Sequence, residues 1–211
     1  MRILITAGPT REPIDPVRFL SNRSSGRMGY ALAQAALDAG HAVTLVSGPV
    51  SLLAPAGADF RAVQTAQEMF AAVAETIGDC EIAIFSAAVA DYRPVAVAEQ
   101  KIKKTGATLT LELERTQDIL GSARGVFGFA GTLVGFAAES ENLIANAQDK
   151  LVRKGCDLVI ANDISQQGIG FDSAENAVTL CLPGGQTRSL PRQSKTDLAG
   201  ALLAEILQIR A

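Results

Sequence analysis

The sequence predicts an α/β fold with a Rossmann-like, doubly wound and mostly parallel sheet flanked by helices. Short runs rich in Ile, Val and Leu alternate with longer segments in which apolar residues recur at helical spacing. Glycine, proline and serine separate these segments. The chain has 211 residues, of which 48% are hydrophobic and 19% charged, so it can bury a core of its own. We therefore expect one domain spanning residues 1–211.

The first 86 residues predict the element order β-α-β-β-α-β. The first helix opens at Ser24-Ser25-Gly26 and is ended by Gly40. The stretch before it, 7–26, holds three prolines and three serines and is expected to be a long loop. In a parallel sheet the loops after the strands meet at one edge, where ligands usually bind. Strands are expected at 2–6, 42–46, 60–63 and 81–86, and helices at about 24–38 and 66–77.

The second half of the chain continues this alternation after a looser stretch. Residues 89–104 carry three lysines and little amphipathic order, and are expected to form a surface loop. Residues 108–113 (TLTLEL) alternate apolar and polar, as a half-exposed strand does. The sequence PGGQ at 183–186 predicts the turn of a hairpin. The remaining elements are expected as helices at 118–124, 142–154 and 194–209, and as strands at 132–137, 157–161, 176–182 and 187–190.

Composition argues against several classes of function. The net charge is −3, which disfavours a general nucleic-acid-binding protein. No run of about 18 apolar residues predicts a membrane span, and the chain starts in a strand-like segment without a leader pattern. Three widely spaced cysteines fit a reducing cytoplasm and argue against a zinc site. The one histidine, His41, excludes an HExxH site and disfavours a Ser-His-Asp triad.

The junction SNRSSGRMG at 21–29 is the first candidate site. Backbone N–H groups at a helix start and the helix dipole favour an anion, and small residues let the backbone approach a phosphate. The alternative is an ordinary N-cap on a glycine-rich turn. The segment contains neither GxxxxGK[ST] nor GxGxxG.

Two further candidates follow the strand at 81–86. In SAAVADYRP, at 86–94, small residues permit a flat ligand to lie close, and Asp91 could hold a metal ion or a sugar hydroxyl. The alternative is close packing on a helix, with Asp91 as a turn residue. In KIKK, at 101–104, three lysines suit a polyphosphate and can neutralise charge on a transferring phosphoryl group. The alternative is that these lysines are only a charged, solvated surface segment.

The last two candidates lie in the second half of the chain. Lys150, Arg153 and Lys154 lie at the end of a predicted helix, where a spacing of four puts the two lysines on one face. The alternative is that these cations only complement the dipole at the helix end. NDIS, at 162–165, follows a strand and forms either a ligand contact or a simple turn. The candidates together indicate a domain that binds a phosphorylated ligand, such as a nucleotide, without histidine chemistry.

Two other classes of function remain open on the residues alone. A nicotinamide-dependent oxidoreductase usually has GxGxxG after its first strand and an acid at the end of its second. Here the second strand ends in VSGP, at 46–49, and neither Tyr30 nor Tyr92 has a lysine four residues on. The other class is a non-catalytic binding module on the same fold.

Read in order, several segments resemble the phosphopantothenate–cysteine ligase family of coenzyme A synthesis. The first of them is long enough that chance is a poor explanation. The matching segments run from Ile5 to Val178 and are ITAGPTREPIDPVRFLSNRSSGRMG, TLVSGPVSL, SAAVADYRP, KIKK, VGFAAE, the lysines of the helix at 142–154, DLVIANDIS and GFDSAENAV.

The resemblance implies a ligase, unrelated to the ATP-grasp enzymes, that joins 4′-phosphopantothenate to L-cysteine. In the bacterial type CTP activates the carboxylate as an acyl-cytidylate and pyrophosphate leaves; cysteine then displaces CMP. Eukaryotic relatives use ATP. Mg²⁺ is implied as the cofactor, and neither nucleic acid nor a membrane as a partner. The family also implies a homodimer formed through a small β extension, with 108–113 and the hairpin around Gly184 as candidates, and association with a flavin-dependent decarboxylase.

The resemblance also assigns catalytic residues. Asn22 would hydrogen-bond the acyl group, and Lys101, on a lid at 101–106, would stabilise charge at the α-phosphate. Asn22 and Asn162 are expected to bind the acid substrate, and Asp91 is the candidate ligand of the metal ion.

The nucleotide site implied by the resemblance draws on most of the candidate segments. One departs from the family pattern, because Thr116-Gln117 stand where bacterial relatives often have Asn-Pro, which leaves the choice of CTP over ATP open. The expected nucleotide-binding residues are Ser24, Ser25, Gly26, Ala87, Asp91, Lys101, Gln117, Asp118, Ile119, Leu120, Phe136, Lys150 and Lys154.

Overall fold

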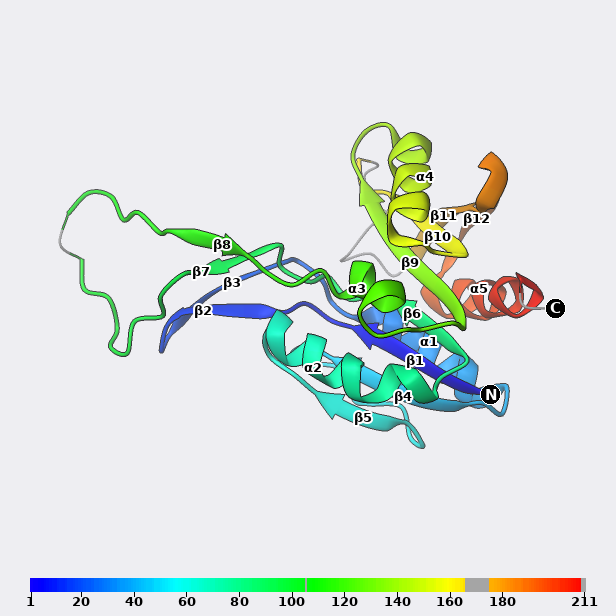
Figure 1. The fold of residues 1–211 in the computed structure, drawn as a ribbon, viewed down its shortest axis with the longest axis horizontal. Helices are drawn as coiled ribbons and strands as arrows, with labels where there is room; N and C mark the ends of the chain where they lie inside the picture. The colour runs from blue at the N-terminus through cyan, green and yellow to red at the C-terminus, as the bar shows by residue number, and fades with distance from the viewer. Residues whose placement is uncertain (105, 166–174, 210–211) are drawn as a thin grey trace.

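A computed structural model describes residues 1–104, 106–165 and 175–209, and it contains a mixed sheet of eight strands with helices on both faces (Figure 1). The strand order is β12-β11-β10-β9-β6-β1-β4-β5. The six strands from β10 to β5 are parallel, and β11 and β12 add an antiparallel hairpin at one edge. The predicted fold class is therefore confirmed. The sheet strands are β1 (Arg2–Ala7), β4 (Ala42–Ser47), β5 (Asp59–Ala62), β6 (Ile82–Phe85), β9 (Thr132–Glu139), β10 (Leu158–Asp163), β11 (Glu175–Cys181) and β12 (Thr187–Ser194).

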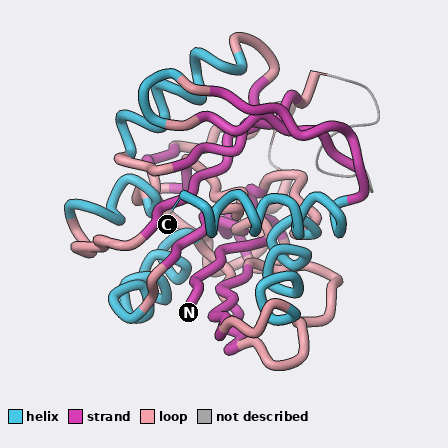
Figure 2. The backbone as a smooth tube through the Cα atoms, turned by 90° about the vertical axis from the view of Figure 1, so that its right-hand side faces the viewer, coloured by secondary structure: helices cyan, strands magenta, loops and turns pink. Residues whose placement is uncertain are grey.

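Helices lie on both faces of the sheet (Figure 2), and an apolar core is buried on each face. Successive side chains of a strand point to opposite faces. In β1, Ile3 and Ile5 accordingly pack under α1 (Arg27–Asp38) and α5 (Lys195–Ile209), whereas Leu4 packs on the other face. That other face is covered by α2 (Ala66–Thr76), α3 (Ile119–Gly125) and α4 (Leu143–Lys154). Short 3-10 turns lie at Ile77–Asp79 and Pro183–Gly185.

An arm of two small antiparallel pairs extends from the carboxyl side of the sheet (Figure 1). The first pair is β2 (Arg11–Asp15) with β3 (Arg18–Ser21), and the second is β7 (Tyr92–Pro94) with β8 (Leu113–Arg115). The backbone N–H of Ala98 donates to the carbonyl of Ile14 at 3.0 Å, which ties the two pairs together. We call residues 11–21 and 92–115, without Thr105, the arm.

Three predictions for the arm are wrong. Residues 89–104 are not a surface loop throughout, because β7 lies within them and pairs with β8. Residues 7–26 are not one long loop, because β2 and β3 form a bulged hairpin within them. The alternating stretch at 108–113 is not a strand over most of its length, because only Leu113 belongs to β8 and Leu109 is largely exposed. Alternation alone does not make a strand where no neighbouring strand supplies hydrogen bonds.

The other predicted elements are confirmed, with boundaries shifted by a few residues. The first helix starts later than predicted, at Arg27, because Gly26 has φ 74° and stands as its N-cap. The predicted hairpin around Gly184 is present as β11 and β12. His41 is only partly exposed. Within the family-like segment GFDSAENAV, residues 170–174 lie outside the described part of the chain.

Candidate functional site

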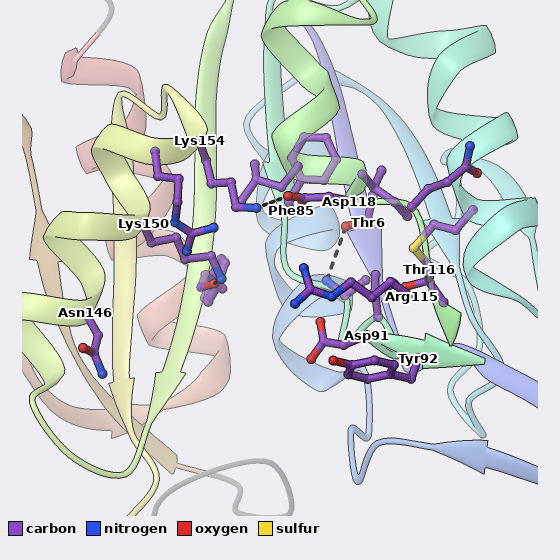
Figure 3. A pocket seen from close by; sticks show the side chains of 18 of the residues that line it. Thr6, Phe85, Asp91, Tyr92, Arg115, Thr116, Asp118, Asn146, Lys150 and Lys154 are labelled. Atoms are coloured by element: carbon purple, nitrogen blue, oxygen red, sulfur yellow. Dashed lines mark hydrogen bonds and ion pairs between the residues drawn. The ribbon is translucent and has the colours of Figure 1, made fainter. Parts of the chain in front are cut away.

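A cleft of about 740 Å³ opens at the carboxyl ends of β1, β6 and β9. Its floor includes Thr6 of β1, Phe85 of β6 and Phe136 of β9. Figure 3 shows α4 side chains on one side of the cleft and Asp91 with Arg115, from the base of the arm, on the other. The position is the one expected for the ligand of a parallel α/β sheet.

The segment after β6 is held against the segment after β1 by buried hydroxyl groups. The hydroxyl of Thr6 accepts from the N–H of Ala87 at 3.3 Å, and that of Thr10 accepts from the N–H of Ala90 at 2.9 Å. Both threonines are almost fully buried, so these bonds satisfy groups that water does not reach. Ala87 and Asp91, two of the expected nucleotide-binding residues, line the cleft.

Asn22 lies beside this segment, although it does not line the cleft itself. Its side-chain N–H₂ group donates to the carbonyls of Ala88 and Val89, both at 3.1 Å. The Asn22 side chain thus links the end of β3 to the segment after β6 that carries Ala87 and Asp91.

Ser24, Ser25 and Gly26 lie at the same sheet edge, before α1, and do not line the cleft. Gly26 has φ 74°, and a Cβ added there would lie 2.8 Å from Val50 Cγ1. Its N–H donates to the hydroxyl of Ser24 at 3.3 Å. Only glycine fits this position, which lets the backbone turn closely into the helix. The structure is consistent with both an N-terminal turn and a phosphate cradle.

Two lysines of α4, both largely buried, reach the cleft and have different partners. The ammonium group of Lys150 donates to the carbonyl of Phe136 at 2.6 Å, and burial lowers the pKa of this lysine. Lys154 forms an ion pair with Asp118 across the cleft (Figure 3). The two lysines therefore do more than complement a helix dipole, because both line the cleft.

Asp118 has two functions in the local structure. It is the N-cap of α3, where its carboxylate accepts from the N–H of Gly121 at 2.9 Å. Burial would raise its pKa, but the hydrogen bond and charge of Lys154 outweigh burial, and the pKa lies below its ordinary value. Its neighbours Gln117, Ile119 and Leu120 line the cleft with it, as does Phe136.

The departure from the family pattern at Thr116 has a structural consequence. The Thr116 hydroxyl donates to the carbonyl of Ala90 at 2.6 Å, and its N–H donates to the carbonyl of Asp91 at 3.0 Å. These bonds hold the segment that leads to Asp118 against the segment that follows β6.

Asn162 lies at the end of β10 and is 8% exposed. Its Oδ1 is the single buried side-chain oxygen or nitrogen without a hydrogen-bond partner in the described residues. Such a group usually has a partner in water or a ligand. Asn162 does not line the cleft. Ser165 donates its N–H and hydroxyl to Asp163, so a turn is present after the strand, as the simpler alternative predicted.

Lys101 lies on the arm and does not line the cleft. The predicted catalytic pair, Asn22 and Lys101, is therefore not brought together with the α4 lysines within this chain. The predicted lid at 101–106 includes Thr105, which lies outside the described residues.

Sequence reasoning missed several polar residues of the cleft, among them Asn146 and Arg115. Asn146 lies four residues before Lys150, so the helical spacing that joined Lys150 and Lys154 could have found it. Arg115 comes from β8, and no signal in the sequence placed that strand beside the cleft.

The residues of the cleft fit a magnesium ion only if a substrate supplies further oxygens. No group of three or more His, Cys, Asp or Glu side chains suited to a metal ion occurs in the part of the chain that the structure describes. Mg²⁺ in nucleotide sites is commonly held by one or two carboxylates together with substrate phosphates. Asp91, with a carboxylate facing the cleft in Figure 3, meets that requirement.

The cysteines contribute to packing. Cys156 and Cys181 are buried, and Cys80 is partly buried. Burial raises the pKa of Cys156 to about 11, so its thiol stays protonated near neutral pH. In residues 1–104, 106–165 and 175–209 no helix has both the length and the apolar character needed to span a membrane.

The chain is similar to known proteins over nearly its whole length. The family model of the DNA/pantothenate metabolism flavoprotein C-terminal domain matches residues 1–209. The coenzyme A biosynthesis bifunctional protein CoaBC of Vibrio vulnificus strain YJ016 is 50% identical over 206 residues, which cover 97% of this chain and 51% of that protein. The chain therefore spans about half the length of the curated relatives it matches.

Solved structures agree with these matches. The crystal structure of the C-terminal domain of a CoaBC protein superposes with a TM-score of 0.83 at 40% identity, covering 99% of this chain and 94% of that one. A mutant of Cab2 in complex with phosphopantothenate-cysteine superposes with a TM-score of 0.78 at 17% identity, covering 98% and 85% of the two chains, and this likeness shows the fold alone.

Proposed function

Because this chain belongs to the family of the DNA/pantothenate metabolism flavoprotein C-terminal domain, we propose that it is a phosphopantothenate–cysteine ligase acting in coenzyme A synthesis in the cytoplasm. It joins 4′-phosphopantothenate to L-cysteine, consumes CTP, and releases CMP and pyrophosphate. Relatives that are about half identical to this chain bear the name of a coenzyme A biosynthesis protein. A protein of the same fold was solved with phosphopantothenate-cysteine bound.

The observation that carries the proposal is the composition of the cleft. Its walls bring together the strand end at Ala87 and Asp91, the α3 start at Asp118, and the two α4 lysines. A nucleotide of appropriate size enters such a cleft with its phosphates near cations and its sugar or metal ion near a carboxylate. No histidine lies in the lining, and the proposed reaction requires none.

The reaction proceeds in two displacements. A carboxylate oxygen of 4′-phosphopantothenate attacks the α-phosphorus of CTP, and pyrophosphate leaves with the broken phosphoanhydride bond. The amine of cysteine then attacks the acyl carbon; the amide forms, the amine loses a proton, and CMP leaves. Both steps depend on orientation and on neutralisation of negative charge. Asn22 orients the acyl group, Lys101 neutralises charge at the α-phosphate, and Lys150 and Lys154 hold the nucleotide.

The other assigned residues complete the binding site. Ser24, Ser25 and Gly26 cradle phosphate groups with backbone N–H groups. Asp91 would hold Mg²⁺, which supplies neutralisation of the triphosphate when bound. Asn162 directs its unpaired Oδ1 to the acid substrate. Gln117, Ile119, Leu120 and Phe136 form the wall against which the nucleotide packs.

The working unit is a homodimer, and the arm is the surface that forms it. The arm exposes apolar side chains at Val17, Phe19, Val95 and Leu109. Clustered exposed apolar groups on an extension favour burial against another surface. Since the curated relatives are bifunctional and twice as long, the chain also works beside a flavin-dependent decarboxylase.

Pyrophosphate release tests the proposal. The purified chain is mixed with Mg²⁺, 4′-phosphopantothenate and cysteine, with CTP or ATP added separately. We expect release with CTP that depends on phosphopantothenate. Pyrophosphate release with ATP but not with CTP would support the ligase reaction and contradict the assignment of CTP as its nucleotide. Absence of release with both, from a folded dimer, would support a binding module, and hydride transfer from a nicotinamide cofactor would support an oxidoreductase.

A further inference from the structure

We propose that Asp15 is a positioning residue for Lys101, which it holds in place through the backbone of Ile102. The inference rests on the proposed ligase function, because it gives Asp15 a purpose only if Lys101 acts in the reaction. It concerns a contact between two parts of the chain that are 87 residues apart.

The two carboxylate oxygens of Asp15 have separate partners. Oδ1 accepts from the N–H groups of Val17 and Arg18, both at 2.9 Å, which forms the turn between β2 and β3. Oδ2 accepts from Nη1 of Arg18 at 3.0 Å and from the N–H of Ile102 at 3.1 Å. One oxygen therefore serves the turn, and the other reaches across to the Lys101 segment.

Arg18 completes a clamp on Ile102. Its Nη2 donates to the carbonyl of Ile102 at 3.2 Å, while Asp15 accepts from the N–H of the same residue. Both polar backbone atoms of Ile102 are thus held, and Lys101 precedes it directly. The hydrogen bond from Ala98 to Ile14 holds the chain three residues before Lys101. The backbone is therefore hydrogen-bonded to β2 on both sides of Lys101, at Ala98 and at Ile102.

The charge of Asp15 strengthens this clamp. The Asp15 side chain is fully buried against the hairpin, in contact with the Arg18 guanidinium. Burial would raise its pKa, but hydrogen bonds from Val17 and Ile102 and the charge of Arg18 outweigh burial and lower it. Asp15 is thus ionised at neutral pH, and a charged acceptor forms stronger hydrogen bonds than a neutral one.

The turn alone does not explain the second oxygen. An asparagine at this position would keep Oδ1 and the two turn bonds, since Asn forms the same kind of turn. In place of Oδ2 it would present an N–H₂ donor to two other donors, Arg18 Nη1 and Ile102 N–H. Asp15→Asn therefore separates the clamp from the turn with almost no change in volume.

The test compares Asp15→Asn with Lys101→Gln in pyrophosphate release. We expect Asp15→Asn to lower kcat by about 10- to 100-fold, since small displacements of a catalytic group cost about that much, with the KM for CTP within about two-fold. The double variant should be no slower than Lys101→Gln alone, because both changes remove one function. If Asp15 had only a structural role, the double variant would show the kcat losses of both single variants combined.

Two further variants keep the test decisive. Glu114→Gln is the matched control, because Glu114 is an arm carboxylate paired with Arg93 at 2.9 Å and does not touch the Lys101 segment; its kcat should stay near wild type. Ile102→Pro removes the clamped N–H from the other side and leaves Asp15 intact, so it should lose kcat as Asp15→Asn does.

Amide hydrogen exchange at Ile102 tests the clamp without a measurement of catalysis. In the wild-type chain the Ile102 amide should exchange slowly for a loop residue, and in Asp15→Asn it should exchange at least about ten-fold faster while the sheet amides stay unchanged. An Asp15→Asn protein with wild-type kcat would overturn the inference. A wild-type chain that releases no pyrophosphate would instead contradict the proposed function, and unchanged exchange at Ile102 would contradict the clamp.

Discussion

Lys150 carries a charge into a part of the cleft where solvation is reduced, and its pKa is lowered for that reason. Its ammonium group is held at 2.6 Å from the Phe136 carbonyl, which aims it along the cleft wall. Lys150→Met keeps the apolar stem and removes the charge. We expect the Kd for CTP, measured by titration calorimetry, to rise by about 10- to 100-fold, the value of one or two charged hydrogen bonds.

The stability of Lys150→Met provides the control. Removing a poorly solvated charge stabilises the fold, whereas removing its hydrogen bond to the Phe136 carbonyl destabilises it. The free energy of unfolding should therefore change by less than about 1 kcal/mol. Unchanged CTP binding in a folded Lys150→Met protein would contradict the assignment of this lysine to the nucleotide.

Asp118 gives a prediction on pH. Its pKa is lowered in the folded chain, so its ion pair contributes stability above the unfolded pKa near 3.8 and loses it as pH falls through the lower folded pKa. Asp118→Asn keeps an N-cap for α3 and removes the pair with Lys154. Since the Asp118 side chain is 54% exposed, the loss at pH 7 should be at most about 1 kcal/mol.

Urea denaturation of both proteins checks this sign. The difference in free energy of unfolding between wild type and Asp118→Asn should be constant from pH 7 to about pH 5 and should shrink below about pH 4. A difference that grows in acid would mean that the Asp118 pKa is raised in the fold.

At the scale of elements, apolar periodicity was sufficient for the sheet and its helices. The parallel strands are short apolar runs with buried ends, so the pattern in the sequence reports their burial directly. The strands of the arm were not predicted, in part because two of the buried positions in β2, Glu12 and Asp15, are charged. Glu12 of β2 is 2% exposed and accepts from the N–H of Ala66 at 2.8 Å, at the start of α2. A buried carboxylate that caps a distant helix has no signature in local sequence.

The residues of the candidate site likewise fall into two groups, those that the sequence could locate and those that it could not. Ala87, Asp91 and Lys150 follow or face predicted strands, so the rule that strand ends gather at one edge located them. Arg115 and Lys101 are carried by the arm, whose path depends on long-range hydrogen bonds such as that from Ile102 to Asp15. Their positions could not be derived from the sequence, and the resemblance gave a role to Lys101 without giving its place.

The contact of α1 with the sheet depends on Gly29. A Cβ at this residue would lie 2.6 Å from both Ala7 Cβ and Ser86 Oγ, so the helix start would have to move away from β1 and β6. We expect Gly29→Ala to lower the free energy of unfolding by about 1–3 kcal/mol through overpacking. Gly200→Ala in α5 is the control, because no atom lies within 4 Å of its added Cβ.

Gly200→Ala should raise the free energy of unfolding by about 0.5–1 kcal/mol, because alanine is the better helix former. Chemical denaturation of the two variants distinguishes a packing effect from a backbone effect. Equal effects of both substitutions would show that the close approach of α1 to the sheet does not limit stability.

For the whole molecule, the separation of Lys101 from the cleft has a consequence for assembly. The cleft is lined by the α4 lysines, whereas Lys101 lies on the arm, next to Ile102, which Asp15 and Arg18 hold. If the arm is the dimer interface, as proposed above, it carries Lys101 toward the partner. We therefore expect each active site of the homodimer to use the cleft of one protomer and Lys101 of the other.

Mixed dimers test this arrangement. Lys101→Gln and Lys150→Met are each expected to be nearly inactive. In a dimer with one copy of each, the Lys101→Gln protomer supplies an intact cleft and the Lys150→Met protomer supplies an intact Lys101. Co-expression with two different affinity tags and two purification steps isolates that mixed dimer. Its rate of pyrophosphate release should be about half that of wild type, since one of the two symmetric sites is complete.

The alternative arrangement predicts the opposite result from the same sample. If each Lys101 served its own cleft, both sites of the mixed dimer would lack one lysine, and the rate would stay at the level of the parents. Light scattering on the mixed sample confirms that the measured species is a dimer. A chain that is monomeric by light scattering yet turns over at its full rate would rule out a site shared between protomers, because Lys101 would then have to reach the cleft of its own chain.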